Sequence, residues 1–265
     1  MRFDIKLLGR LDATLDGVPI LPSASKPRQL LALLALNAGH IVSTPTLMTE
    51  MWGELQPRAA STSLYTYVSS LRTKLRLALN GCSDCDPKRI LVTEQTGYSL
   101  RVSLSDTDVG QYEEHANAGR VAAGRGDYET ASQRLGTALA LWRGSALSDL
   151  VAGPALTVDI VRLEENRVRD LDLRIEADLR LGRHRMLLAE LAELCARFPM
   201  SENLCKKYML ALCRAGEQWR ALQAFQRLRS TMIQELGMDP SASLQRLHMA
   251  ILRRHPAVDD PNFPW

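Results

Sequence analysis

The sequence predicts an N-terminal α+β domain followed by an all-α domain. Within the first 105 residues, two segments in which apolar and polar residues alternate enclose three segments of helical periodicity. From Asp108 to about Leu252 the periodicity is helical, with no convincing strand, and glycine-containing turns interrupt it. With 265 residues, the chain is long enough for two cores at roughly 100–200 residues per domain.

The first twenty residues predict a β-hairpin or a small sheet. Phe3, Ile5 and Leu7 alternate with charged residues, which is the pattern of a half-buried strand. Asp16-Gly17 is a strong two-residue turn signal, and apolar residues flank it on both sides. We therefore expect paired strands across this turn.

Three helices are expected next, over residues 28–37, 45–52 and about 57–79. Pro27 suits the first turn of the first helix, and a glycine follows each of the first two helices. The first helix is apolar on most sides, so we expect it at the centre of the core. The third helix is the longest.

A second hairpin is expected after a polar loop over residues 80–88. Ile90 and Val92 fall on one face of a strand, residues 94–97 form a turn, and Tyr98 and Leu100 alternate back. The order β-β-α-α-α-β-β is that of a winged helix-turn-helix with an additional N-terminal sheet. The second hairpin is the wing of that fold.

The second half of the chain shows a degenerate repeat. Gly126, Gly182 and Gly216 lie in similar turns, and the last two are 34 residues apart, the period of tetratricopeptide (TPR) helix pairs. The first two are 56 residues apart, so an extra helix or a long loop is expected between them. We expect residues 1–105 to form the winged-helix domain, residues 106–255 to form TPR-like helical repeats, and residues 256–265 to be a frayed, proline-rich tail.

The positive charge of the chain is concentrated in the first domain. The whole chain has 33 Lys+Arg and 30 Asp+Glu, whereas residues 1–105 have 12 and 8 and residues 106–265 have 21 and 22. A moderately basic domain that contains a basic helix is typical of nucleic-acid readers, although solvated basic helices are also common.

The third helix has one face suited to a DNA groove. At 100° per residue, its apolar side chains fall on one side and its cations and hydroxyls on the other. Arginine can bond guanine edges, threonine methyls can contact thymine, and hydroxyls can bond phosphates or bases. A solvated amphipathic helix is the alternative. The helix-turn-helix context and the lack of any acid on this face favour DNA, and the expected recognition residues are Arg58, Thr62, Tyr65, Thr66, Ser69, Arg72, Thr73 and Arg76.

The wing and the first helix add residues that are candidates for contacts with the DNA backbone. Gln95 and Thr96 lie at the expected wing tip, and two basic residues precede the wing strand. At the start of the first helix, side chains and free N–H groups could meet a phosphate. Tyr98 either packs the hairpin on the third helix or contacts phosphate, and Gly97 is expected to serve the turn conformation. The full set is Lys26, Arg28, Lys88, Arg89, Gln95, Thr96 and Tyr98.

Several other classes of protein are excluded by the sequence. No apolar run approaches the ~18 residues that span a membrane, and no secretory leader is recognisable. There is no HExxH, GxSxG or GxGxxG, and the SxxK at residues 23–26 lacks its partner motifs, so we expect neither an enzyme nor a bound cofactor.

The five cysteines fit a reducing cytoplasm, where we expect the protein to work. Cys82 and Cys85 form a CxxC, but a zinc site needs four ligands and no second Cys/His pair lies nearby. A neutral loop is therefore favoured over a metal or redox switch. We expect the other three cysteines in the helical core, and we expect no metal site.

Segments in both halves resemble the Streptomyces antibiotic regulatory proteins, which join an OmpR-like winged helix to a bacterial transcriptional activation domain. The resemblance extends over about residues 3–252. Its matching segments are KPRQLLALL at 26–34, LYTYVSSLR at 64–72, VT at 92–93, TGYSL at 96–100, and AL, F, LR, ELGMDPS and L at 221–222, 225, 228–229, 235–241 and 244.

This resemblance implies a pathway-specific activator of secondary-metabolite genes. It implies that two protomers bind promoter direct repeats head-to-tail on one face of double-stranded DNA and contact the RNA polymerase holoenzyme. It also makes the third helix the recognition helix and residues 95–98 the wing. Because the chain has no GxxxxGK[ST], we expect a short member without an ATPase module. The alternative is a TPR-like interaction scaffold with a domain that binds DNA without sequence preference.

Overall fold

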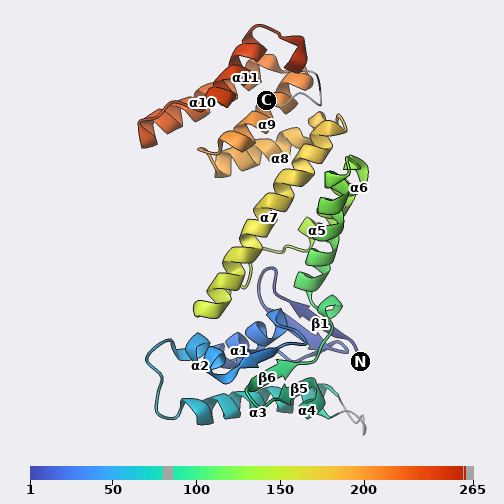
Figure 1. Ribbon diagram of the computed structural model, residues 1–265, viewed down its shortest axis with the longest axis vertical. Helices are drawn as coiled ribbons and strands as arrows, with labels where there is room; N and C mark the ends of the chain where they lie inside the picture. The colour runs from blue at the N-terminus through green and yellow to red at the C-terminus, as the bar shows by residue number, and fades with distance from the viewer. Residues whose placement is uncertain (80–85, 259, 261–265) are drawn as a thin grey trace. The chain divides into compact units, whose positions relative to one another are not determined.

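The computed structural model describes residues 1–79, 86–258 and 260. The chain forms two compact units, which are described separately. Unit 1 comprises Met1–Ala118 and Arg134–Asp170, and unit 2 comprises Gly119–Gln133 and Leu171–Trp265. Figure 1 shows the order of the elements along the chain.

The N-terminal sheet has three antiparallel strands in the order β1-β2-β3. They are β1 (Phe3–Lys6), β2 (Asp12–Leu15) and β3 (Val18–Pro19). Asp16 and Gly17 have φ angles of 48° and 81°, so the turn between β2 and β3 places two successive residues in the left-handed region. This is the geometry that Asp-Gly favours in tight hairpins, and it confirms the predicted turn.

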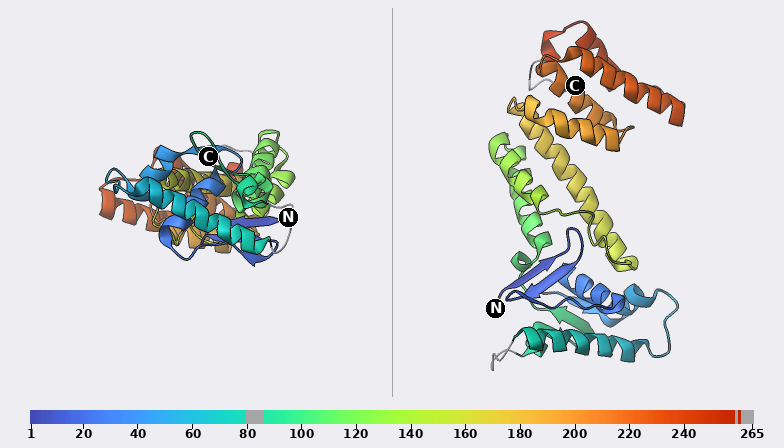
Figure 2. Two further views of the ribbon diagram at one scale, coloured as in Figure 1. Left: turned by 90° about the horizontal axis from the view of Figure 1, so that it is seen from below. Right: turned by 180° about the vertical axis from the view of Figure 1, so that it is seen from behind.

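Three helices form the helix-turn-helix region. They are α1 (Ser25–Leu36), α2 (Thr44–Trp52) and α3 (Ala60–Ala78). The Ser43 hydroxyl caps α2 by accepting the N–H of Thr46 at 3.2 Å. Within unit 1, α3 lies on the outside, and the left panel of Figure 2 shows it in front of the rest of the unit.

The wing sheet contains one strand more than predicted. Strands β5 (Leu91–Thr93) and β6 (Gly97–Leu100) form the expected hairpin, and β4 (Ile41–Ser43) pairs with β6 to give the order β4-β6-β5. A short helix, α4 (Pro87–Ile90), precedes β5 where we expected a loop. Its cap is the Asp86 carboxylate, which accepts the N–H of Lys88 at 2.9 Å. The winged helix-turn-helix with an N-terminal sheet is confirmed.

The helical half contains α5 (Asp108–Gly124), α6 (Tyr128–Ala140), α7 (Pro154–Arg180), α8 (His184–Arg197), α9 (Glu202–Arg214), α10 (Gln218–Leu236) and α11 (Ala242–Leu252). Gly126, Gly182 and Gly216 have φ angles of 78°, 74° and 85°, so the three predicted turns share one backbone conformation. The expected insertion is a loop over residues 141–153. Among the described residues after Leu100 there is no further strand, as predicted.

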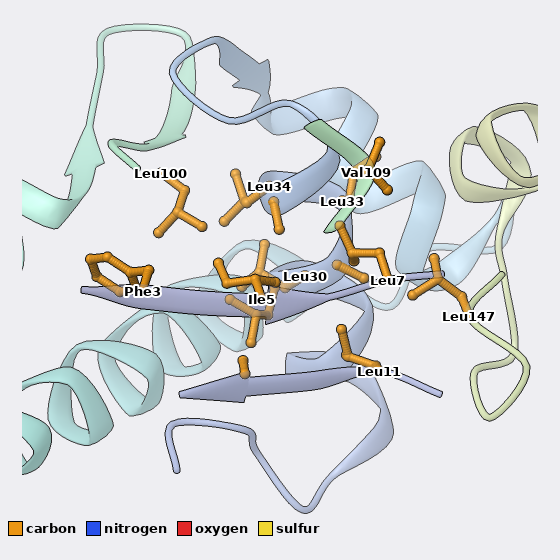
Figure 3. Packing of buried hydrophobic residues seen from close by; sticks show 14 of the residues in the cluster. Phe3, Ile5, Leu7, Leu11, Leu30, Leu33, Leu34, Leu100, Val109 and Leu147 are labelled. Atoms are coloured by element: carbon orange, nitrogen blue, oxygen red, sulfur yellow. The ribbon is translucent and has the colours of Figure 1, made fainter. Parts of the chain in front are cut away.

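The core of unit 1 lies between the N-terminal sheet, α1 and α3. Figure 3 shows Phe3 and Ile5 of β1 against Leu30 and Leu34 of α1, with Leu100 of β6 beside them. Eight residues of α1 are buried, which confirms that it is the central helix.

This core continues into the helical half of the sequence. Tyr112 of α5 is fully buried and meets Trp142 edge to face at 5.5 Å between ring centroids. Leu147 and Leu156 belong to the same apolar cluster as β1 and α1. The first 105 residues therefore share their core with residues 109–163.

Unit 2 has its own apolar cores. One is formed by α9, α10 and α11, and another by α7, α8 and α9. Pro256–Val258 forms a 3-10 turn, and Val258 is 2% exposed. Arg214 donates to the Val258 carbonyl at 3.0 Å and to that of Asp260 at 2.8 Å, so this part of the expected tail is packed rather than frayed. No helix among the described residues is long and apolar enough to cross a membrane.

Candidate nucleic-acid interface

The inner face of α3 packs on the core as the sequence predicts. Leu64, Val68, Leu71 and Leu75 are buried at intervals of three or four residues, which is one stripe of a helix. Tyr67 stacks on Trp52 of α2 at 6.2 Å between ring centroids. This contact holds the two helices of the helix-turn-helix against each other.

The outer face of α3 is exposed and carries no carboxylate. Exposed side chains of the predicted set are Thr62, Tyr65, Thr66, Ser69, Thr73 and Arg76. Arg58 is also exposed, but it precedes the first helical residue, Ala60, so it lies in the α2–α3 connection rather than on the helix.

Two of the threonine hydroxyls on this face donate hydrogen bonds within α3. Thr66 donates to the Thr62 carbonyl and Thr73 to the Ser69 carbonyl, each at 3.0 Å. Their oxygens can still accept. The face therefore offers a terminal cation that suits phosphates or guanine, hydroxyl acceptors that suit donor groups on base edges, and an exposed tyrosine ring.

Arg72 differs from its neighbours because it is half-buried and faces the wing. Its Nε and Nη2 donate to the Leu91 carbonyl at 3.0 and 2.7 Å, and Nη2 also donates to the Thr93 hydroxyl at 2.8 Å. We expected this side chain in the groove. The structure instead places these two nitrogens on β5, so Arg72 links α3 to the wing.

The wing tip exposes Gln95 and Thr96. The structure requires glycine at position 97 for a different reason from the expected turn conformation. Its φ is not positive, but a Cβ here would lie 2.0 Å from the Val42 carbonyl oxygen, so glycine permits the close approach of β4 to β6. Tyr98 is half-buried against the core, which favours its packing role.

The remaining basic candidates fall into two groups. Lys88 and Arg89 are exposed on α4 beside the wing. Lys26 is half-buried and donates to the Met51 carbonyl, and Arg28 pairs with Asp149. A phosphate contact by either of the last two stays a prediction, and it would have to compete with these internal partners.

The helix-turn-helix is tied to the start of α7 by Glu50. This residue of α2 is 3% exposed, and its carboxylate accepts the N–H groups of Gly153, Ala155 and Leu156 at 2.6, 2.8 and 3.0 Å. A carboxylate is stabilised at a helix N-terminus by unpaired N–H groups and by the helix dipole. The sequence does not reveal this role, because a buried glutamate in a helix leaves no local signal.

A second buried carboxylate ties the N-terminal sheet to α5. Asp108 accepts the N–H groups of Leu7 and Leu8 at 2.7 and 3.0 Å and pairs with Arg143 at 3.3 Å. Its burial raises the pKa of the carboxyl group, and these partners offset part of that rise. The N-terminal sheet and the helix-turn-helix are thus joined to α5 and α7 by buried polar contacts as well as by a core.

Three of the five cysteines lie in the part of the chain that the structure describes. Among the described residues, no three His, Cys, Asp or Glu side chains cluster in a way that could hold a metal ion. Cys195, Cys205 and Cys213 are not joined in disulfides, and of these three only Cys205 is fully buried. The CxxC motif of Cys82 and Cys85 lies outside the described residues.

Comparison with known proteins agrees with this geometry. A family model described as "Bacterial transcriptional activator domain" matches residues 107–252, and one described as "Transcriptional regulatory protein, C terminal" matches residues 21–100. The regulatory protein DnrI of Streptomyces peucetius is 46% identical over 255 residues, which cover 96% of this chain and 94% of DnrI. The chain belongs to the Streptomyces antibiotic regulatory protein family.

Other relatives match nearly the whole of this chain and are longer than it. The transcriptional regulatory protein EmbR of Mycobacterium tuberculosis is 34% identical, over 96% of this chain and 64% of EmbR. A solved structure of EmbR in complex with a low-affinity phosphopeptide matches with a TM-score of 0.86, over 98% of this chain and 68% of that one. The family consists of DNA-binding transcriptional regulators, which agrees with the expectation of a regulator rather than an enzyme.

Proposed function

We propose that this family member activates an antibiotic or other secondary-metabolite gene cluster by binding direct repeats in its promoters. In this proposal α3 enters the major groove, the wing tip and α4 contact the flanking backbone, and two protomers bind head-to-tail. The observation that carries it is the outer face of α3, which is exposed, free of acids and ends in a cation at Arg76.

The modest positive charge of residues 1–105 supports the proposal that two protomers bind adjacent repeats together. Residues 1–105 carry an excess of only four positive charges, so one protomer alone gains little non-specific affinity. A second protomer on a neighbouring repeat raises the effective concentration at the first. This supports cooperative binding to repeated sites.

We also propose that the helical half contacts RNA polymerase. Three valines of α7 in unit 1 (Val158, Val161 and Val168) are 56–69% exposed and recur with helical spacing. Since Glu50 fixes the start of this helix to the helix-turn-helix, such a surface would be held at a set distance from the DNA. Exposed apolar rows of this kind are typical of protein interfaces.

A footprint on the promoters of a linked biosynthetic cluster tests the DNA-binding proposal. Protection of regularly spaced repeats is expected. Arg76→Ala should weaken operator binding by about 1–3 kcal/mol if it reads a base, or lower the salt slope by about one if it contacts phosphate. Arg10→Ala changes an exposed arginine that is distant from α3 in the sequence. It should change neither the affinity for the operator nor the salt dependence of binding. Uniform protection of any duplex would favour the scaffold alternative instead.

A further inference from the structure

Unit 2 contains a cavity that none of the functions above uses. It has a volume of about 300 Å³ and is lined by α8, α9, α10 and the turn between α8 and α9. That volume lies at the lower end of the range for small-molecule sites. Every lining residue belongs to unit 2 and none belongs to the proposed DNA face.

The cavity exists because small side chains line its two long walls. Ala192 and Ala196 lie on α8, and Ala224 lies on α10. Larger side chains at these positions would fill the space between the helices. Phe198 and Pro199 of the intervening turn add apolar surface.

The walls are uncharged apart from one residue. Burial raises the pKa of the Cys195 thiol to about 11 and that of Cys205 to about 12. Both thiols are therefore protonated near neutral pH and act as small, weakly polar wall groups. Leu228 completes the apolar lining between them.

Arg227 is the one charged residue of the lining. It is exposed, and its guanidinium has no hydrogen-bond or ion-pair partner in the part of the chain that the structure describes. Tyr208 also lines the cavity. Its hydroxyl accepts a hydrogen bond from Arg220 at 3.1 Å and keeps its own proton to donate. An unpaired cation and a phenol donor beside apolar walls are complementary to a single anionic group on an apolar body.

We propose that this cavity binds a small amphipathic carboxylate, whose apolar part lies between α8 and α10 and whose carboxylate meets Arg227 and Tyr208. A carboxylate suits these partners because guanidinium and phenol groups both donate to it, and no acid lines the cavity to repel it. A partner helix is favoured less. Such a helix needs anchor pockets spaced along a groove, and these residues line one compact cavity.

The test uses the full-length protein and three probes with the same alkyl chain: decanoate, decanol and decylammonium. Displacement of anilinonaphthalene sulfonate fluorescence reports binding. Decanoate should bind saturably and more tightly than decanol, and decylammonium should bind least. Arg227→Gln should weaken the binding of decanoate by about tenfold, because one charge-assisted hydrogen bond is lost. The affinity for decanol should not change.

Two further variants separate this site from general surface binding. Ala196→Phe, at an exposed position on the cavity wall, should abolish binding of decanoate and decanol alike by filling the cavity. Arg185→Gln, which changes another exposed arginine on α8 outside the lining, should change nothing. Circular dichroism verifies that each variant is folded.

Two results would overturn the proposal. In one, decanoate binds equally well to the wild type, Arg227→Gln and Ala196→Phe. In the other, no probe binds, while Ala196→Phe abolishes transcription activation without affecting DNA binding. The second result would assign the cavity to a protein partner.

Discussion

At the residue scale, Arg72 shows where a helical wheel reaches its limit. The wheel separates the buried stripe of α3 from its outer face, and burial confirms that division for Leu64, Val68 and Leu71. Arg72 follows Leu71 at the border of the two faces. A long side chain at such a border can turn either way, and only the position of β5 decides that it bonds the Leu91 carbonyl.

Arg72→Ala should act through the wing rather than through one base pair. It removes the hydrogen bonds to Leu91 and Thr93, so we expect a loss of about 1–3 kcal/mol in the free energy of unfolding and weaker binding to operator and non-operator DNA alike. Arg72→Lys should not restore either property, since lysine lacks the fork of donors. Urea unfolding and gel shifts with both DNAs measure this. Arg76→Ala is the control, with unchanged stability.

Glu50→Ala should destabilise the protein strongly, because this buried carboxylate caps the start of α7. It leaves three N–H groups at the start of α7 without their acceptor, which we expect to cost about 2–4 kcal/mol in the free energy of unfolding. Glu54→Ala, at an exposed glutamate just after α2, should cost little. Equal unfolding midpoints in denaturant for the two variants would contradict the capping role.

His248 should make the stability of the protein depend on pH below neutrality. Burial and the charge of Arg229 lower the pKa of His248 from 6.5, and its ring stacks on Phe225 at 4.0 Å between centroids. The unfolded chain then binds more protons below pH 6.5, so stability present above that pH is lost as the pH falls through the folded-state pKa. In His248→Gln this dependence should be smaller. Thermal melts of both proteins between about pH 7 and pH 5 measure it, and parallel curves would refute it.

At the element scale, prediction succeeded where local chemistry decides the structure. Asp16-Gly17 specifies a tight turn, and glycine at 126, 182 and 216 specifies three helix-pair turns. Strand β4 was missed because three residues are too few for a periodic signal, and its pairing with β6 is distant in sequence. Such pairing depends on the tertiary structure.

Replacing glycines in the helical half by alanine should change stability in opposite directions, depending on the backbone conformation of each glycine. Gly126→Ala, Gly182→Ala and Gly216→Ala each place a Cβ on a residue with positive φ, with open space or only a distant side-chain atom around it, so strain alone should cost about 1 kcal/mol. Gly136→Ala lies within α6, where φ is not positive and no atom would touch the new Cβ. It should raise stability by roughly 0.5–1 kcal/mol. Melting temperatures of all four should show opposite signs for the two classes.

At the scale of the whole molecule, the sequence indicates two functional halves but not how the core divides. The expected boundary at residues 105/106 follows the change from mixed to helical periodicity, and it stays a prediction. The core of unit 1 crosses it, because Tyr112, Trp142 and Leu156 pack in the same cluster as Ile5 and the α1 leucines. Periodicity reports which face of an element is apolar, not which element will cover it.

A fragment ending at residue 105 should therefore be poorly folded. It would expose the face of the core that Tyr112, Trp142 and Leu147 cover, and it would remove Asp108 from the N–H groups of Leu7 and Leu8. A fragment of residues 1–170 keeps these contacts and should unfold cooperatively and bind operator DNA. Proton NMR dispersion and denaturant unfolding compare the two. A well-dispersed, cooperative 1–105 fragment would show that the shared core is dispensable.

The contact between Glu50 and the first turn of α7 has a consequence for promoter architecture. A buried carboxylate rather than a flexible linker joins the helix-turn-helix to that helix. In the proposed binding mode, the angle at which α3 enters the groove would therefore set the direction in which the α7 valines face. Moving the operator by half a turn of the double helix, about five base pairs, would point that surface to the opposite side of the DNA. Activation would then depend on the helical phase between operator and promoter as well as on the distance between them.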